Sequence, residues 1–369
     1  MKKLIQTSFV ICFLLVLAVP FVRFNKYGTI SEVENRNLAT RPFLLADNRI
    51  NKNLFSEYNA YFDDRFGGRF PLISLNQHIE QILHKNSIQY NERALQGKNG
   101  WWFYISVPDG DNLQDFYKKN LMNEEQLAVW KQNVKNTADW CQANGIKSIF
   151  LICPNKHSVY SEFYPFPRPK GETRSDMLVR ILDKLGVSYI YPRDILLQKK
   201  IDFDYPLYYE TDTHWNSAGA YIASRLLKEK IELYFPDIEF PEIEYETDVY
   251  YSMGTGDILP MIGVKESKST QPNVHPKYFD NSDFYTYEKT EEINGLHTRG
   301  INKNLPRALI FRDSFFSALE PFISPLFSEA EYKWKQFRNE DKDYVLKYKP
   351  DIIIFESVER YSPGLVICN

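Results

Sequence analysis

An aspartate and a histidine that stand two residues apart have the types and the spacing that proton transfer needs. Asp212 and His214 lie in the stretch TDTHWNSAGA (211–220). In an extended chain such residues point to the same side, so the carboxylate can hold one ring nitrogen of the imidazole. That contact fixes the tautomer and leaves the other nitrogen free to act as a general base. Asn216 or Ser217 is then expected to cap the helix that follows.

Ser314 is the residue that could use such a base and act as a nucleophile. It follows the apolar run RALIF (307–311), which predicts a buried strand, and it precedes a helical pattern. A serine at this kind of junction lies beyond a strand end, where backbone amides can stabilise an oxyanion. The alternative interpretation is structural. Ser314 would then cap the helix, and Asp212 would satisfy a buried histidine.

Four further residues are candidates for an oxyanion hole or a substrate pocket, namely Asn155, Lys156, Arg312 and Trp215. Asn155 and Lys156 follow the predicted strand 147–153, so they can reach the same end of a parallel sheet as the serine. Each candidate also has a structural alternative. Asn155 could make a turn and Lys156 could be solvated. Arg312 could pair with its neighbours, and Trp215 could pack beside the histidine.

The sequence predicts neither a metal site nor a cofactor. The four cysteines form no C-x-x-C pair, and His157, His275 and His297 have no spacing typical of metal ligands. The stretch GTGD (254–257) lacks the Gly-Lys-Ser/Thr ending of a phosphate-binding loop. We therefore expect Asp257 to serve in a loop or a helix cap.

Alternating strands and helices are expected to position these side chains. Strands are predicted at 147–153, 187–191, 307–311, 330–334 and 351–355. The capping pair Asn123 and Gln126 opens one of the intervening helices, and Gly145 ends it. Such alternation predicts right-handed crossovers and a mainly parallel sheet, with active sites beyond the carboxyl ends of its strands. The Asn-Gly turn in ALQGKNGWWFYIS (94–106) predicts a hairpin.

The N-terminal region predicts a membrane anchor. Lys2 and Lys3 precede an uncharged apolar run from Leu4 to Val22, whose length suits one bilayer crossing. The basic start predicts a cytoplasmic N-terminus and an extracytoplasmic chain beyond the anchor. The alternative is a cleaved signal peptide, with the chain then secreted or periplasmic.

The chain is expected to have three parts. These are an anchor or signal segment at 1–25, a connector and helical region at 26–94, and an α/β domain at 95–369 with an insertion at about 235–305. Two helices are predicted in the connector, divided at Gly67–Gly68. The net charge is −3 without a basic patch, so no nucleic-acid partner is expected.

Several stretches together resemble the SGNH-like O-acetyltransferases of the alginate O-acetyltransferase type and the related DHHW family. The two main ones are TDTHWNSAGA and FRDSFFSALEPFI. Others agree in order, namely ENRNLATRP, YFDDRFGGR, GKNGWWFY, CPNKHSVYSEFYP, TGDIL and PDIIIFESVER. The resemblance implies a permuted, three-layer SGNH-hydrolase-like fold. It also implies a triad in which Ser314 is the nucleophile, His214 the base and Asp212 the orienting acid.

The same resemblance implies an extracytoplasmic O-acyltransferase that transfers an acetyl group to a cell-surface or exported polysaccharide through a serine acyl-enzyme. It implies a partner as well, a multi-spanning membrane acyltransferase that supplies the acyl donor. Two alternatives stay open at this point. One is a secreted carbohydrate esterase with the same triad, and the other is a non-catalytic glycan-binding or assembly protein.

Overall fold

The computed structural model describes most of the chain beyond residue 90 and parts of the region before it. The described residues are 7, 9–11, 13–14, 24–26, 29–31, 36–46, 49–67, 90–106, 110–242, 245–253, 256–264, 268–276, 281–290 and 294–367. The predicted anchor at 1–25 lies largely outside these residues, and so does the second helix predicted after Gly68. Across the described residues, no helix combines the length and the apolar character that a bilayer crossing requires.

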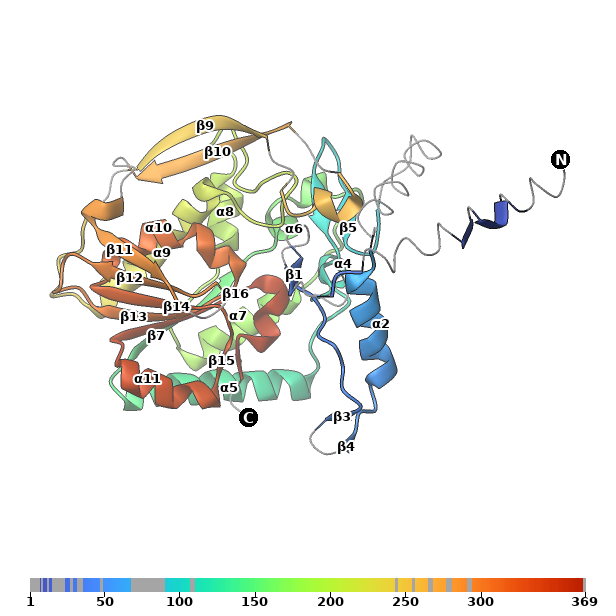
Figure 1. Cartoon of the computed structure of the whole chain (residues 1–369). Coiled ribbons are helices and arrows are strands. Elements are labelled where there is room, and N and C mark those ends of the chain that lie inside the picture. Colours follow the sequence, from blue (N-terminus) through green and yellow to red (C-terminus); the bar gives the residue numbers. More distant parts are fainter. Residues whose placement is uncertain are drawn as a thin grey trace.

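A seven-stranded mixed sheet forms the centre of the fold, in the order β11-β12-β14-β13-β16-β7-β8 (Figure 1). The strands are β7 (Lys147–Cys153), β8 (Tyr189–Ile190), β11 (Tyr285–Lys289), β12 (Leu296–Gly300), β13 (Arg307–Phe311), β14 (Glu329–Lys333) and β16 (Ile352–Val358). The run from β14 to β8 is parallel, whereas β12 and β11 add an antiparallel edge. The predicted parallel sheet is confirmed for the five strands from β14 to β8, which include β7 and β13, the two strands that lead into candidate residues.

Helices cover both faces of this sheet because its central strands are apolar on both sides. All seven residues of β16 are buried. Ile354 packs in the cluster on one face, and Phe355 packs in the cluster on the other. The first face is covered by α8 (Arg193–Lys199), α9 (Ser217–Tyr234) and α10 (Glu320–Ile323), and the second by α5 (Glu124–Ala143), α7 (Arg174–Leu185) and α11 (Lys342–Tyr348) (Figure 1). The sheet therefore lies between two helical layers.

The predicted insertion at 235–305 contains two long strands. β9 (Tyr245–Met253) and β10 (Lys268–Pro276) pair antiparallel over nine residues and form a ribbon (Figure 1). The end of the segment supplies β11 and β12, which join the central sheet. Part of the predicted insertion is thus an integral edge of the core.

Two helix starts follow their predicted caps. Asn123 and Gln126 form both hydrogen bonds of a capping box at the start of α5, each 2.9 Å long. The side chain of Asn216 accepts from the backbone N–H groups of Ala218 and Gly219, at 3.0 and 3.1 Å, and so opens α9. Because α9 starts there, the segment just before it is held at a fixed angle to the sheet.

The predicted hairpin is also present. β5 (Ala94–Gln96) pairs with β6 (Trp102–Tyr104), and Asn99 and Gly100 between them have φ of 55° and 86°. This left-handed backbone is what an Asn-Gly turn provides. The N–H of Trp102 donates to the carbonyl of Glu210 at 2.9 Å, so the hairpin contacts the segment that carries His214.

Smaller elements complete the described part of the chain. They are α2 (Leu54–Arg65), α4 (Asn112–Tyr117), α6 (Lys156–Val159), and the pairs β1 (Ile30–Ser31) with β2 (Arg36–Asn37), β3 (Leu45–Ala46) with β4 (Arg49–Ile50), and β15 (Phe337–Arg338) with β17 (Val366–Ile367). The helix α2 matches the first of the two helices predicted in the connector.

Candidate active site

The structure brings Asp212, His214 and Ser314 together at the carboxyl end of the parallel strands. The Nε2 atom of His214 lies 2.7 Å from the Oγ atom of Ser314. The Nδ1 atom of the same ring lies 2.6 Å from Oδ1 of Asp212. Both distances suit proton transfer or a strong hydrogen bond. The arrangement can therefore lower the cost of removing the serine proton.

The serine is positioned by Asp313, the residue that connects β13 to the short 3₁₀ helix Ser314–Ala318. Asp313 Oδ1 accepts from the N–H of Phe315 at 2.9 Å, and Oδ2 accepts from the N–H of Val358 at 2.7 Å. Its own N–H donates to Oε2 of Glu356 at 2.8 Å. These bonds tie the turn before Ser314 to the neighbouring strand β16, so the hydroxyl has little freedom to move away.

The loop that carries His214 is fixed by Lys156. Its Nζ donates to three backbone carbonyls, those of Tyr209, Glu210 and Asp212, at 3.0, 3.0 and 2.7 Å. An ammonium group has three protons, so none remains for an oxyanion. Burial lowers the pKa of Lys156 to about 7, against the opposing charge of Asp212. The structure thus corrects the sequence interpretation, because Lys156 supports the loop and is not solvated or free to bind substrate.

The charges of the pair favour a basic histidine. Burial would raise the pKa of Asp212, but the charge and hydrogen bonds of His214 outweigh it and lower that pKa to about 2. Burial would likewise lower the pKa of His214, but the Asp212 carboxylate raises it above its ordinary value. Asp212 is therefore ionised at neutral pH and stabilises the imidazolium that forms when Ser314 loses its proton.

Asp257 lies against the pair of Asp212 and His214. The sequence predicted only a role in a loop or a helix cap for this residue. Its Oδ2 is 3.5 Å from Nδ1 of His214, and its N–H donates to Oδ2 of Asp212 at 3.0 Å. Its carboxylate also accepts from the N–H and the hydroxyl of Thr213, at 2.6 and 2.5 Å. Burial and the charge of Asp212 raise the pKa of Asp257 to about 6. The loop of Asp257 thus packs against the segment that carries Asp212 and His214.

This close approach depends on Gly256. Its φ is +62°, and a Cβ at that position would lie 2.4 Å from the carbonyl oxygen of Thr211. Only glycine allows the two loops to lie this close together.

Asp212, His214 and Asp257 are also near enough to one another to hold a cation, because their ligand atoms lie within 4.8 Å. However, both ring nitrogens of His214 already contact Asp212 and Ser314. A metal at this position would have to displace one of those contacts. The donor set therefore fits an acid–base pair better than a metal centre.

Asn155 offers a free hydrogen-bond donor near the triad. Its backbone N–H donates to Glu359 at 2.8 Å, and its Oδ1 accepts from Arg360 at 3.2 Å. Its Nδ2 is buried and has no partner among the described residues. Asn155 and Arg360 line the same small cavity as Thr213, the neighbour of His214. The amide of Asn155 is thus a candidate oxyanion donor, as the sequence suggested.

Arg360 is a residue that the sequence interpretation did not select. Its guanidinium lies 5.5 Å from the ring of Phe315, the residue after the candidate nucleophile, and its charge acts on His214. It ends the stretch PDIIIFESVER, so its position just after a predicted strand was a signal that could have been used.

Arg312 and Trp215 form hydrogen bonds with the 3₁₀ helix that begins at Ser314. Arg312 donates to Ser317 Oγ at 2.8 Å and to the carbonyl of Asn294 at 3.0 Å. Trp215 is fully buried, and its indole N–H donates to the carbonyl of Phe315 at 3.0 Å. Trp215 therefore packs beside the histidine, which was the structural alternative, and it does not line a substrate pocket.

A known protein family matches a large part of this chain. The profile of the family described as SGNH hydrolase-like domain, acetyltransferase AlgX, matches residues 94–296, which is more than half of the 369 residues. The chain belongs to this family. The matched region contains Asp212, His214 and Asp257, and it ends before Ser314. No match was found among curated proteins.

Several solved structures are similar to this chain. PatB1 of Bacillus cereus is 14% identical, with a TM-score of 0.54, and the match covers 74% of this chain and 97% of PatB1. The O-acetyltransferase domain of Pseudomonas putida AlgJ is 16% identical, with a TM-score of 0.49 and coverage of 74% and 93%. A DHHW family protein from Eubacterium siraeum is 14% identical, with a TM-score of 0.48 and coverage of 77% and 98%. The family match and the PatB1 likeness confirm the predicted SGNH-hydrolase-like α/β fold.

Proposed function

We propose that this protein is an O-acyltransferase that acetylates a polysaccharide through an acyl-enzyme on Ser314. The observation that carries the proposal is the contact between His214 and Ser314, backed by Asp212. Membership of an acetyltransferase-type family supports acyl transfer, and the resemblance of the sequence motifs to alginate O-acetyltransferases supports a polysaccharide acceptor in a broad sense.

In the first half-reaction, Oγ of Ser314 attacks the carbonyl carbon of an acyl donor while Nε2 of His214 takes its proton. The tetrahedral intermediate then expels the donor's leaving group, which receives the proton from His214. Its oxyanion would accept hydrogen bonds from the backbone N–H of Ser314 and from Nδ2 of Asn155. Each such donor is worth about 3 kcal/mol in serine enzymes.

In the second half-reaction, a sugar hydroxyl attacks the acyl ester. His214 removes the proton of that hydroxyl and returns a proton to Oγ of Ser314 as the ester bond breaks. Asp212 keeps the imidazole in one orientation through both steps. The products are an O-acylated sugar and the free enzyme.

We place this reaction outside the cytoplasmic membrane, with the segment 1–25 as an anchor. The apolar run between Leu4 and Val22 supports that location. The acyl donor would then come from a multi-spanning membrane acyltransferase.

Acylation of the full-length protein by 4-nitrophenyl acetate tests the first half-reaction. Intact-mass spectrometry should detect one acetyl adduct, and Ser314→Ala should abolish it. Ser161→Ala is a matched control, because Ser161 begins a different 3₁₀ helix and makes no contact with His214 that the structure records. The Ser161→Ala protein should still be acylated. No adduct in the parent protein with several activated esters would support the non-catalytic alternative instead.

An esterase with the same triad is the second candidate. The side chain of His214 is 22% exposed, so solvent reaches the histidine that would activate a water molecule. Release of acetate without acylated sugar, at saturating oligosaccharide, would favour the esterase. Transfer to the sugar under those conditions would favour the transferase.

A further inference from the structure

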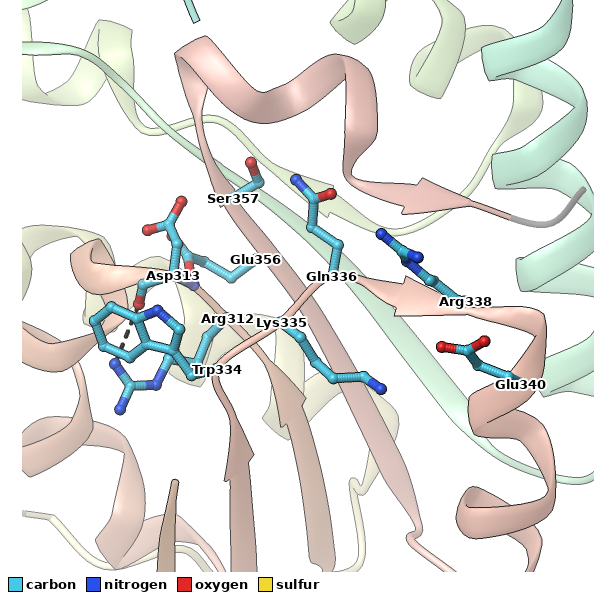
Figure 2. Close-up of a pocket in the computed structure, with 9 residues that line it drawn as sticks. All are labelled: Arg312, Asp313, Trp334, Lys335, Gln336, Arg338, Glu340, Glu356 and Ser357. Carbon is cyan, nitrogen blue, oxygen red and sulfur yellow. Dashed lines mark hydrogen bonds between the residues drawn. The ribbon is translucent and has the colours of Figure 1, made fainter. Parts of the chain in front are cut away.

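A second cavity, of about 330 Å³, lies at the carboxyl ends of β13, β14 and β16 (Figure 2). We call it the elbow cavity, and the residues that matter here are Arg312, Asp313, Trp334, Gln336, Arg338 and Glu356. Asp313 forms part of its wall and immediately precedes Ser314. One lining residue of the cavity is thus the direct neighbour of the candidate nucleophile in sequence. The cavity does not include His214, so it is separate from the triad.

Two buried polar atoms at this cavity have no partner in the described part of the chain. Glu356 is 2% exposed, and its Oε2 accepts from the N–H of Asp313 at 2.8 Å. Its Oε1 has no partner at hydrogen-bond distance among the described residues, although the buried Cys153 thiol acts on the same carboxyl. The Nε atom of Arg312 is also buried without an acceptor. Buried polar atoms usually have partners because they lose their hydration on folding. A carboxyl group and a guanidinium that both keep unused hydrogen-bonding capacity line one cavity, and such a lining suits a ligand with hydroxyl groups.

The charges around the cavity do not favour an anion or a cation. Positive groups come from Arg312, Lys335 and Arg338, and carboxyl groups come from Asp313, Glu340 and Glu356. Burial and the charge of Asp313 raise the pKa of Glu356 well above its ordinary value. Figure 2 shows Gln336 between the group around Asp313 and the pair Arg338 and Glu340.

An aromatic side chain completes the lining. The guanidinium of Arg312 lies over the ring of Trp334, with 4.2 Å between Cζ and the ring centroid. This cation–π contact fixes the orientation of both side chains. A fixed aromatic ring beside mixed hydrogen-bonding groups is suited to a ligand that has both C–H surfaces and hydroxyls. The cavity volume lies near the lower end of the range of about 300–1,000 Å³ for small-molecule sites.

We propose that the elbow cavity binds one neutral sugar ring of the acceptor, next to the ring whose hydroxyl attacks the ester on Ser314. This inference rests on the proposed function, because it assumes that the acceptor is a polysaccharide. The neighbouring ring would be held by Trp334, Arg312 and Glu356. Its binding would place the reacting hydroxyl on the far side of Asp313, where Ser314 lies.

Binding is tested on the full-length Ser314→Ala protein, which cannot turn over. The probes are a cello-oligosaccharide, an N-acetylglucosamine oligosaccharide and an oligomannuronate of equal length, and the measurement is isothermal titration calorimetry. At least one neutral probe should bind more tightly than the uronate. A second substitution in the Ser314→Ala protein, Gln336→Phe, places a larger side chain in the cavity. It should weaken binding about tenfold, the loss expected when one buried contact with the ligand is removed. Trp334→Ala should weaken binding similarly, and Trp334→Phe should restore most of it.

The matched control is Tyr287→Ala on β11, because Tyr287 is an exposed aromatic residue outside the cavity. It should leave binding unchanged. The proposal is overturned if neither neutral probe binds, if the uronate binds best, or if Gln336→Phe binds as well as its parent. Near-UV circular dichroism of each variant separates loss of binding from loss of fold.

Kinetics distinguish a failure of the cavity from a failure of the proposed function. With Ser314 intact, Gln336→Phe should slow transfer to the neutral acceptor about tenfold more than it slows acylation by 4-nitrophenyl acetate. Equal slowing of both steps contradicts the subsite. Absence of acylation in the parent contradicts the proposed function, and the binding measurements still decide whether the cavity takes a sugar.

Discussion

The Nε2 atom of His214 lies 2.7 Å from the hydroxyl oxygen of Ser314, although 100 residues separate them in sequence. The two residues approach because β13 and the segment before α9 both end at the carboxyl edge of the sheet. Since the other ring nitrogen contacts Asp212 at 2.6 Å, the orientation of the imidazole is set before any substrate arrives. Pre-orientation of this kind reduces the reorganisation that proton transfer would otherwise need.

Asp212→Asn should lower the rate of acyl-enzyme formation by about 10⁴-fold, the loss seen when the acid of a serine triad is changed to an amide. The amide would hold the wrong tautomer of His214 and would not stabilise an imidazolium. Stopped-flow release of 4-nitrophenolate measures the effect. Asp139→Asn on α5 is the control, because Asp139 is exposed and remote, and its rate should match the parent. A loss of less than tenfold would exclude the assigned role of Asp212.

Asn155→Ala should lower kcat about 10²- to 10³-fold with little change in KM, because an oxyanion donor acts mainly in the transition state. The substitution also removes the acceptor of a hydrogen bond from Arg360. Arg360→Ala removes that bond and keeps the amide, so its loss should be smaller. Equal losses in the two variants would mean that Asn155 only positions Arg360.

The pH dependence of acylation should follow the protonation of His214. Only the neutral imidazole accepts a proton, and its pKa is raised above 6.5, so kcat/KM should rise with pH and reach half its maximum above pH 6.5. Asp257→Asn removes a nearby negative charge that favours the imidazolium. The pKa of His214 then falls, and the acid limb moves to lower pH. A profile that stays in place or moves to higher pH would show that Asp257 does not act on His214.

Gly256→Ala should destabilise the protein and reduce acylation together. The new Cβ would meet the carbonyl of Thr211 at 2.4 Å, and this backbone cannot move without shifting Asp212. Gly186→Ala at the end of α7 is a matched control, since Gly186 has φ of +65° and open space around it. The control should cost about 1–2 kcal/mol, the price of a left-handed non-glycine residue, and keep its activity.

The Gly256 variant should cost more than that control in urea unfolding. Its acylation rate should fall by at least about tenfold, in line with a shift of around 1 Å in the orienting acid. Equal stability and full activity in both variants would show that the loop of Asp257 adapts without disturbing the triad.

Local patterns in the sequence were enough to predict several parts of this structure. Asn123 and Gln126 make contacts within one helical turn, so the capping box could be recognised from its spacing alone. The strands at 147–153 and 307–311 are apolar on both faces and could be found in the same way. The Asp–x–His pair is local too, and the choice of Ser314 followed from its place after a strand.

Contacts between distant segments could not be predicted in this way. Lys156 reaches the carbonyls of residues 209–212, and nothing in its own neighbourhood identifies those partners. Asp257 approaches His214 from a loop more than forty residues later. Strands β11 and β12 have mixed polar composition because they form an edge, so the pattern suited loops as well as strands. In each case the tertiary arrangement supplies information that spacing does not contain.

The place of β16 in the sheet has a consequence for how this protein matures. β16 lies between β13 and β7, yet it follows both of them along the chain. Until residues 352–358 insert, the sheet exists as two unconnected halves, and the turn bearing Ser314 lacks its bond from Val358. A polypeptide still emerging from the ribosome would therefore be inert. Ser314 would be positioned for reaction only after β16, residues 352–358, had inserted into the sheet.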